Sequence, residues 1–187
     1  MTNWACQGEH GSVEVRPARI EDAGQIALVH VRSWQQAYRG LVPQEYLDSL
    51  DLDQRASAWK RVLEQPDPTG RAILVMGSGD TLAGFVSLGP ARDEDQNPDQ
   101  VGEVRAIYLL ADAWGKGLGR QLMAAAVERL AAAGFEQAVL WVLDSNVRAR
   151  RFYEAGGWSA DGAVKDDDSR GFRMTELRYC FPLPRAD

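Results

Sequence analysis

Soft metal ligands are scarce in this chain. Its 187 residues include two cysteines and two histidines, and Cys6 and Cys180 stand near opposite ends with no CxxC pair. Zinc and iron–sulfur sites need several Cys or His side chains at close spacing. The sequence therefore predicts no metal site, and its two thiols are those expected of unpaired cysteines in a reducing cytoplasm.

Long hydrophobic runs and an excess of positive charge are also missing. No run of eighteen apolar residues occurs, and the N-terminal segment lacks the basic-then-apolar order of a secretion signal. Lys and Arg number 21 against 27 Asp and Glu, a net charge of −6. Binding to nucleic acid needs a basic face. We therefore expect a cytoplasmic protein whose partners are neither membranes nor nucleic acids.

The composition suits one folded domain. With 45% hydrophobic residues and no internal repeat or linker, the chain is long enough to bury a core without staples. The polar start of the sequence predicts a flexible lead-in over residues 1–12. Residues 13–187 are then predicted to form a single domain.

Hydrophobic periodicity predicts a mixture of strands and helices. Helices are expected over 20–40, 43–65, 118–134 and 147–155, the second with a possible break near residues 50–52. Strands are expected over 12–18, 71–77, 81–89, 101–110, 137–143, 158–164 and 172–181, with an acidic loop over 165–170. The unit from 101 to 143 predicts a parallel crossover. The expected fold is α/β of the α+β kind, a mixed sheet with helices on both faces.

Three glycines stand where the third long helix begins, in the run "WGKGLGR". Glycine costs a helix about 0.5–1 kcal/mol relative to alanine. Gly115, Gly117 and Gly119 would let the backbone approach a ligand, and a helix start offers unpaired N–H groups. Lys116 and Arg120 add positive charge. This pattern predicts an anionic, diphosphate-bearing ligand, although close packing of helix on strand would also explain glycine.

Two common phosphate motifs do not fit this spacing. A dinucleotide GxGxxG would place Leu118 or Arg120 at its last glycine, and a Walker loop would place Leu110 at its first. A nucleotide-binding α/β protein therefore stays only an alternative.

The order of motifs resembles the GNAT superfamily of acyl-CoA-dependent N-acetyltransferases. Its signature is Arg/Gln-x-x-Gly-x-Gly/Ala after a strand, then a further strand, then a helix with Asn and Tyr. This chain has Trp114 to Gly119, then "AVLWVL", then "DSNVRARRFYEAGGW". Trp114 replaces Arg/Gln, which weakens one side-chain contact and leaves the main-chain amides. The resemblance covers about residues 13–181 and implies a mostly antiparallel sheet of about seven strands with a central splayed parallel pair.

The resemblance implies acetyl-CoA as co-substrate. Backbone amides over 115–120 would bind its pyrophosphate, and the strand at 107–109 would hold the pantetheine arm if the neighbouring strands splay apart. Asn146 is expected to contact the arm, to cap the last helix, or both. Arg148, Arg150 and Arg151 would neutralise phosphates, or at least two of them would form a solvated face. The predicted acetyl-CoA contacts are Ile107, Tyr108, Leu109, Trp114, Gly115, Lys116, Gly117, Leu118, Gly119, Arg120, Asn146, Ala149 and Arg150.

Two residues are candidates for proton transfer. Tyr153 stands where the family has a phenolic acid that protonates the departing thiolate; the alternative is a core aromatic. Glu103 is the candidate general base, directly or through a water; the alternative is a carboxylate paired with Arg105 or facing solvent. Neither cysteine falls in a motif, so attack on the thioester should be direct.

The expected reaction is acetyl transfer to a primary amine of a small molecule or peptide. Trp34 and Tyr38, one turn apart on the first helix, are candidates for the acceptor pocket, with a core stripe as the alternative. A homodimer would fit the family. The competing hypothesis is an acyl-CoA-binding regulatory module without turnover.

Overall fold

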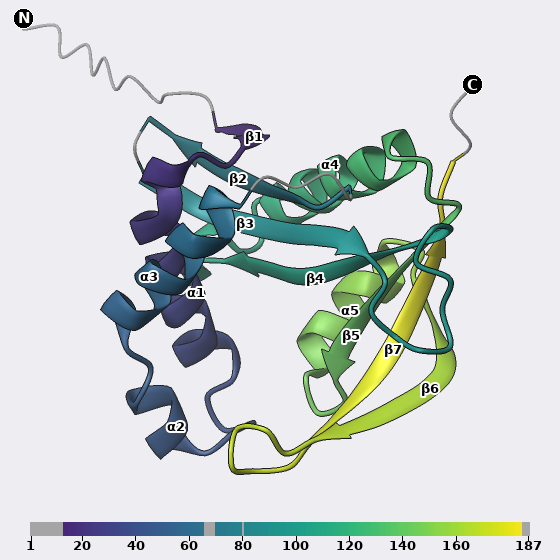
Figure 1. Cartoon of the computed structure of the whole chain (residues 1–187). Helices are drawn as coiled ribbons and strands as arrows, with labels where there is room; N and C mark the ends of the chain where they lie inside the picture. Colours follow the sequence, from purple (N-terminus) through teal and green to yellow (C-terminus); the bar gives the residue numbers. More distant parts are fainter. Residues whose placement is uncertain (1–12, 66–69, 80, 185–187) are drawn as a thin grey trace, which may run out of the picture.

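A computed structural model describes residues 13–65, 70–79 and 81–184 of the chain (Figure 1). The predicted lead-in over 1–12 lies outside the described residues. Among the residues that are described, no helix is both long and apolar enough to span a bilayer.

One seven-stranded sheet organises the described chain. Its strands lie in the order β1-β2-β3-β4-β5-β7-β6, and all neighbours pair antiparallel except the central β4 and β5, which are parallel. The predicted mixed, mostly antiparallel sheet is therefore confirmed. The strands are β1 Glu14–Pro17, β2 Ala72–Ser78, β3 Thr81–Pro90, β4 Val101–Leu109, β5 Gln137–Leu143, β6 Ser159–Asp167 and β7 Met174–Pro182.

The predicted acidic loop over 165–170 is wrong for its first three residues. Lys165, Asp166 and Asp167 continue β6, because they pair with β7 in register, Lys165 opposite Glu176 and Asp167 opposite Met174. A strand at the edge of a sheet tolerates charged side chains on its exposed face. The charged residues therefore did not mark the end of strand β6.

The helices follow the periodicity closely. The first predicted helix begins as a short 3-10 turn, and the second divides in two where Asp51 caps α3 by accepting a hydrogen bond from the Gln54 amide at 2.6 Å. The helical elements are η1 Ile20–Asp22, α1 Ala23–Ala37, α2 Gln44–Asp48, α3 Leu52–Glu64, η2 Ala111–Ala113, α4 Leu118–Ala132 and α5 Val147–Ala155.

The helices cover both faces of the sheet (Figure 1). Successive residues of a strand point to opposite faces, so Leu74 and Met76 join the core beneath α4 and α5, whereas Val75 between them joins the core beneath α1. Figure 1 shows α1 to α3 gathered on one side of the sheet and α4 and α5 on the other.

The centre of the sheet is split. Strand β4 runs to Leu109 and β5 to Leu143, yet they pair only over 101–103 and 137–139. Beyond Glu103 and Val139 no pairing links them, which confirms the predicted splay. The main chain at the open part of this pair needs other hydrogen-bond partners.

Candidate active site

A cavity of about 440 Å³ opens where β4 and β5 part. On one face of the sheet its lining includes Ser33 of α1 and Tyr38, the residue that follows α1, and on the other it includes Phe152 and Tyr153 of α5. Side chains and main chain of β4 line it in between. The cavity therefore passes through the opening in the sheet and connects its two faces.

The glycine loop lies at the mouth of this cavity. Gly115 and Gly117 have φ values of 72° and 80°, and a Cβ on either would meet no atom within 4 Å. At these two positions the left-handed backbone conformation favours glycine, and the space beside the backbone is open. Gly119 differs, because a Cβ there would lie 3.3 Å from the Phe152 ring, so close packing explains it.

The start of α4 is available to an anion. Gly117 is the N-cap residue, and no side chain caps the helix. The Arg120 N–H donates to the Gly117 carbonyl at 3.1 Å, whereas the first two N–H groups of the helix, those of Leu118 and Gly119, have no side-chain cap. The positive end of the helix dipole lies there as well.

Ten of the thirteen predicted acetyl-CoA contacts line the cavity, and three do not. Those that line it are Ile107, Tyr108, Leu109, Trp114, Gly115, Gly117, Gly119, Arg120, Asn146 and Ala149. Lys116 is exposed outside the lining, and Leu118 packs against the core. Arg150 is bound by the Asp144 carboxylate at 2.7 Å and donates to the Tyr179 hydroxyl at 3.2 Å.

Two predicted contacts already have partners within the chain. The Asn146 side chain caps α5 by accepting from the Ala149 amide at 3.1 Å, while the residue also lines the cavity, so the two expected roles occur together. The Leu109 carbonyl accepts hydrogen bonds from the Ser33 hydroxyl and the Trp114 indole, each at 3.0 Å.

Tyr153 reaches the cavity from α5. The residue is 9% exposed and packs edge-on against Phe152 with the ring centroids 5.3 Å apart. Burial, with a smaller contribution from Tyr108, raises the pKa of the Tyr153 phenol. The hydroxyl is therefore protonated throughout the physiological range, as a proton donor must be.

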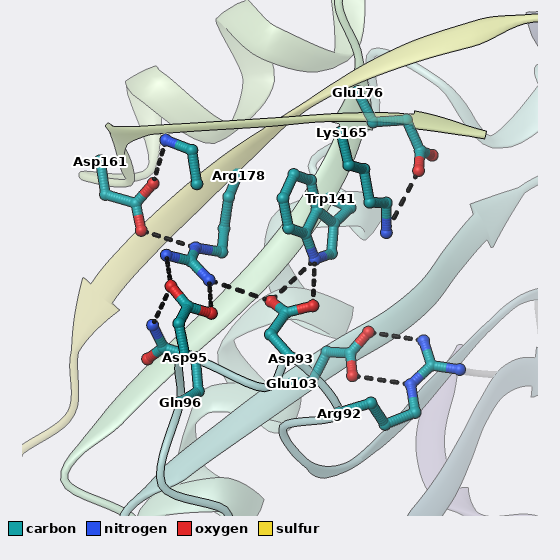
Figure 2. Close-up of polar contacts among 11 residues, drawn as sticks. Arg92, Asp93, Asp95, Gln96, Glu103, Trp141, Asp161, Lys165, Glu176 and Arg178 are labelled. Atoms are coloured by element: carbon teal, nitrogen blue, oxygen red, sulfur yellow. Dashed lines mark hydrogen bonds and ion pairs between the residues drawn. The ribbon is translucent and has the colours of Figure 1, made fainter.

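Glu103 does not line the cavity. It lies in the part of β4 that still pairs with β5, is 3% exposed, and binds Arg92 through both oxygens at 2.6 and 2.8 Å (Figure 2). Arg105, the partner considered from the sequence, is a second neighbour at 3.9 Å. Glu103 thus lies where the sheet is closed, whereas Tyr153 lines the cavity.

Of the two predicted acceptor-site residues at the end of α1, only one lines the cavity. Tyr38 lines the cavity, and burial raises the pKa of its phenol. Trp34 is a buried core residue behind it, with the two ring centroids 4.6 Å apart.

No pattern in the sequence pointed to Trp141 of β5, a second aromatic residue in the cavity lining. This side chain lines the cavity, and its indole N–H donates to the Asp93 carboxylate at 3.0 and 3.1 Å. Asp93 belongs to the segment 91–100 that links β3 to β4. A residue on an interior strand is thereby oriented by a loop far away in the sequence.

Arg178 of β7 joins that loop to the sheet (Figure 2). Its side chain is 7% exposed and donates to Asp93 at 3.1 Å, to Asp161 at 2.7 Å, and to both oxygens of Asp95 at 2.7 Å. The hydrogen bonds from Arg178 lower the pKa of Asp95 to about 2. These contacts pair residues up to 85 positions apart, so no local pattern could have predicted them.

No group of three or more His, Cys, Asp or Glu side chains is placed to hold a metal ion in the described parts of the chain. What the arrangement offers is a passage with main-chain donors at one mouth, a protonated phenol inside, and aromatic walls at the other end. That geometry suits an extended anionic ligand entering from one face and a smaller reactant from the other.

Comparison with known proteins identifies relatives. Residues 30–158 match the acetyltransferase (GNAT) family. The chain is 34% identical over 172 residues to the uncharacterized N-acetyltransferase YuaI of Bacillus subtilis, which covers 91% of this chain and 93% of that protein. It is 27% identical over 171 residues to the spermidine N(1)-acetyltransferase of Thermoplasma acidophilum, covering 90% and 98%.

A solved structure shares the fold. The PaiA N-acetyltransferase from Thermoplasma acidophilum, in complex with coenzyme A, superposes with a TM-score of 0.69 at 22% identity, covering 92% of this chain and 99% of that one.

Proposed function

Since this chain belongs to the acetyltransferase (GNAT) family, we propose that it transfers the acetyl group of acetyl-CoA directly to a primary amine of a small molecule or peptide. The observation that carries the proposal is the cavity that passes through the split sheet, with the glycine loop at one mouth. A thioester entering there would meet an amine entering from the opposite face. Both reactants would then be held in one geometry, which removes much of the entropic barrier to a two-molecule reaction.

The donor end of the cavity would bind the diphosphate of acetyl-CoA. Open space at Gly115 and Gly117, and a helix start without a side-chain cap, leave the main-chain N–H groups accessible to phosphate oxygens. The pantetheine arm would lie in the opening, where its amides can pair with the unpaired main chain of β4.

Tyr153 is the proposed proton donor. As the amine nitrogen bonds to the acetyl carbon, the carbon–sulfur bond breaks and the CoA sulfur leaves as a thiolate, which takes the phenolic proton. The nitrogen, positively charged after attack, releases one proton to solvent to give the amide, and the Tyr153 phenolate takes a proton from solvent. An ordinary phenol has a pKa near 10 and an ordinary thiol one near 8.5, so donation requires a hydrogen bond to the sulfur as its charge develops. Burial keeps the Tyr153 phenol protonated for this role.

We assign no side chain as a direct base for the amine. Both oxygens of Glu103 are engaged by Arg92, so that carboxylate would have to break an ion pair before accepting a proton. Instead, the acceptor is proposed to lose its proton to water before attack. An alkylamine with a pKa near 10.4 is neutral in roughly one molecule per few thousand at pH 7, so the rate should rise with pH.

The acceptor end is proposed to lie between Tyr38 and Trp141. Aromatic faces attract ammonium groups and pack against methylene chains, and the hydrogen bonds from Trp141 to Asp93 fix the orientation of the indole. The named activity of the Thermoplasma relative, spermidine acetylation, supports a small aliphatic amine as acceptor.

The test is release of free CoA thiol from acetyl-CoA in the presence of polyamines, amino acids, aminoglycosides and N-terminal peptides. The proposal predicts turnover with at least one class and its loss in Tyr153→Phe. Tight acetyl-CoA binding with no turnover over the whole panel would instead support a regulatory CoA-binding module.

A further inference from the structure

Trp114 and Arg148 form a stacked pair at the mouth of the cavity. The Arg148 guanidinium carbon lies 3.4 Å from the centroid of the Trp114 ring, and both residues line the cavity. Trp114 follows η2 and immediately precedes Gly115, whereas Arg148 lies in the first turn of α5. The pair therefore bridges the two elements that flank the entrance.

This stacking leaves the hydrogen-bonding edge of Arg148 available. A guanidinium that lies flat on an indole contacts it through its face, and all its N–H groups point outward in its plane. The indole N–H is directed elsewhere, to the Leu109 carbonyl. Trp114 thus orients the arginine without competing for the acceptor that the arginine would bind.

Arg148 has no carboxylate partner among the residues that the structure describes. Its neighbour on the same helix, Arg150, is bound by Asp144, whereas no hydrogen bond or ion pair within the described chain involves Arg148. The residue as a whole is exposed, although partial burial of its guanidinium lowers its pKa. An anion bound in the cavity would therefore meet a guanidinium that has no competing carboxylate.

We propose that Arg148, held flat on Trp114, binds the diphosphate of acetyl-CoA through two parallel N–H···O bonds. The arginine would supply from α5 the side-chain contact that a tryptophan at the head of the glycine loop does not supply. The inference rests on the proposed function, because it assumes that CoA occupies this cavity.

The diphosphate is favoured over the 3′-phosphate of CoA because of what surrounds the pair. Trp114 is bonded directly to Gly115, and the Arg148 guanidinium carbon lies 3.4 Å from the centroid of the Trp114 ring, so the guanidinium lies beside the residue at which the glycine loop starts. The main-chain donors of the loop and the guanidinium would therefore converge on one group that carries several oxygens. Arginine binds such groups in bidentate fashion.

Calorimetric titration with three ligands tests the proposal. Arg148→Gln should weaken binding of CoA and of 3′-dephospho-CoA by about 10- to 100-fold, the usual loss for a charge-assisted hydrogen bond. Binding of acetyl-pantetheine, which has no phosphate, should stay unchanged. A loss confined to CoA, with dephospho-CoA unaffected, would overturn the proposal in favour of a 3′-phosphate contact.

Two further variants separate geometry from charge. Arg151→Gln removes the same charge from an exposed residue of α5 outside the cavity lining and should change affinity less than twofold. Arg148→Lys keeps the charge and loses the bidentate geometry, so its affinity should fall between wild type and Arg148→Gln. Equal losses in Arg148→Gln and Arg151→Gln would show a general charge effect and overturn the specific contact.

A rescue experiment completes the test. In the Arg148→Gln background, Trp114→Arg should recover CoA affinity, because it places a cation at the head of the loop. Unchanged affinity in Arg148→Gln itself overturns this inference and leaves the proposed function intact. Failure of the wild-type protein to bind CoA at all would instead refute the proposed function.

Discussion

The two ends of the cavity are built in different ways. The donor end is formed by consecutive segments, the strand, loop and helix from β4 to α4, and its proposed contacts are mostly main-chain amides. The acceptor end is lined by Tyr38, which follows α1, and by Trp141 of β5. Trp141 is oriented by the segment 91–100, which Arg178 of β7 holds. Main-chain contacts at the donor end suit one fixed co-substrate. Side chains at the acceptor end can be substituted, and the acceptor changed, without altering the donor end.

The largest effect should come from the group shared by both ends. Tyr153→Phe removes the proposed proton donor and should lower kcat by about 10²- to 10⁴-fold, with the Kd for acetyl-CoA nearly unchanged. Steady-state kinetics and calorimetry measure the two quantities. Tyr179→Phe is the matched control, because it also removes a buried hydroxyl, one that binds Glu154 at 2.7 Å, and it should leave kcat within about twofold. Equal losses in both variants would contradict the role of Tyr153.

A substitution that changes the backbone conformation of the glycine loop tests the donor end. Gly117→Val places a Cβ at a φ of 80° and should weaken CoA binding by about 100-fold, because the loop must abandon its conformation. Gly134→Val introduces the same strain at the other end of α4, where φ is 90°. That control should lose a similar 1–2 kcal/mol of stability while keeping its CoA affinity. Weakened binding in both would indicate loss of the helix rather than of a phosphate site.

Substitution of Arg178 should weaken binding at the acceptor end and leave acetyl-CoA binding at the donor end unchanged. Arg178→Met leaves Asp93, Asp95 and Asp161 without their shared partner and should cost about 1–3 kcal/mol of stability, measured by urea denaturation, because the three carboxylates are only partly buried. With Trp141 no longer fixed, KM for the acceptor should rise about tenfold and the Kd for acetyl-CoA should not change. Arg173→Gln, which breaks an exposed ion pair with Asp166, is the control. An effect on acetyl-CoA binding would show that the two ends are not separate.

The smallest effect concerns the pH dependence of folding stability, which depends on the buried residue His30. Desolvation, reinforced by Arg55 and Arg170, lowers the pKa of His30 to about 3, and its ring accepts the Trp59 indole N–H at 3.2 Å. The unfolded histidine, with a pKa near 6.5, binds a proton that the folded one does not. Stability should therefore fall as pH decreases from 6.5 toward 3, by at most about 1.4 kcal/mol per pH unit. Urea denaturation between pH 7 and 5 should show a shallower decline in His30→Gln, and identical slopes would contradict this assignment.

The same contrast explains what the sequence could predict. Glycine at a helix start, an Asn cap and a continuously apolar strand are local signals, and they predict the anion site at the glycine loop and the parallel crossover. The resemblance to the family, carried by the same motifs, implied the splayed pair and most of the cavity lining near Gly115 and Asn146. The partners of Glu103 and Trp141 come from the segment 91–100, which reads only as a polar loop. The composition of a loop does not predict which strand the loop will cross. The contacts that orient Trp141 could therefore be identified only from the tertiary structure.

Residues close together on one helix also differ in whether they line the cavity. Trp34 and Tyr38 follow one apolar stripe of α1, yet only Tyr38 lines the cavity while Trp34 packs behind it. Arg148 and Arg150 are likewise close in sequence, and Arg150 was the one predicted as an acetyl-CoA contact, yet only Arg148 lines the cavity. Their difference depends on Asp144 and Trp114, which only the fold brings to them.

A crystal structure of the protein with acetyl-CoA tests the central claim most directly. The account predicts that the pantetheine arm lies between β4 and β5, with the diphosphate on the main-chain amides of 115–120 and the thioester sulfur beside the Tyr153 hydroxyl. A complex in which the opening between β4 and β5 is empty and the nucleotide binds elsewhere on the surface would contradict it.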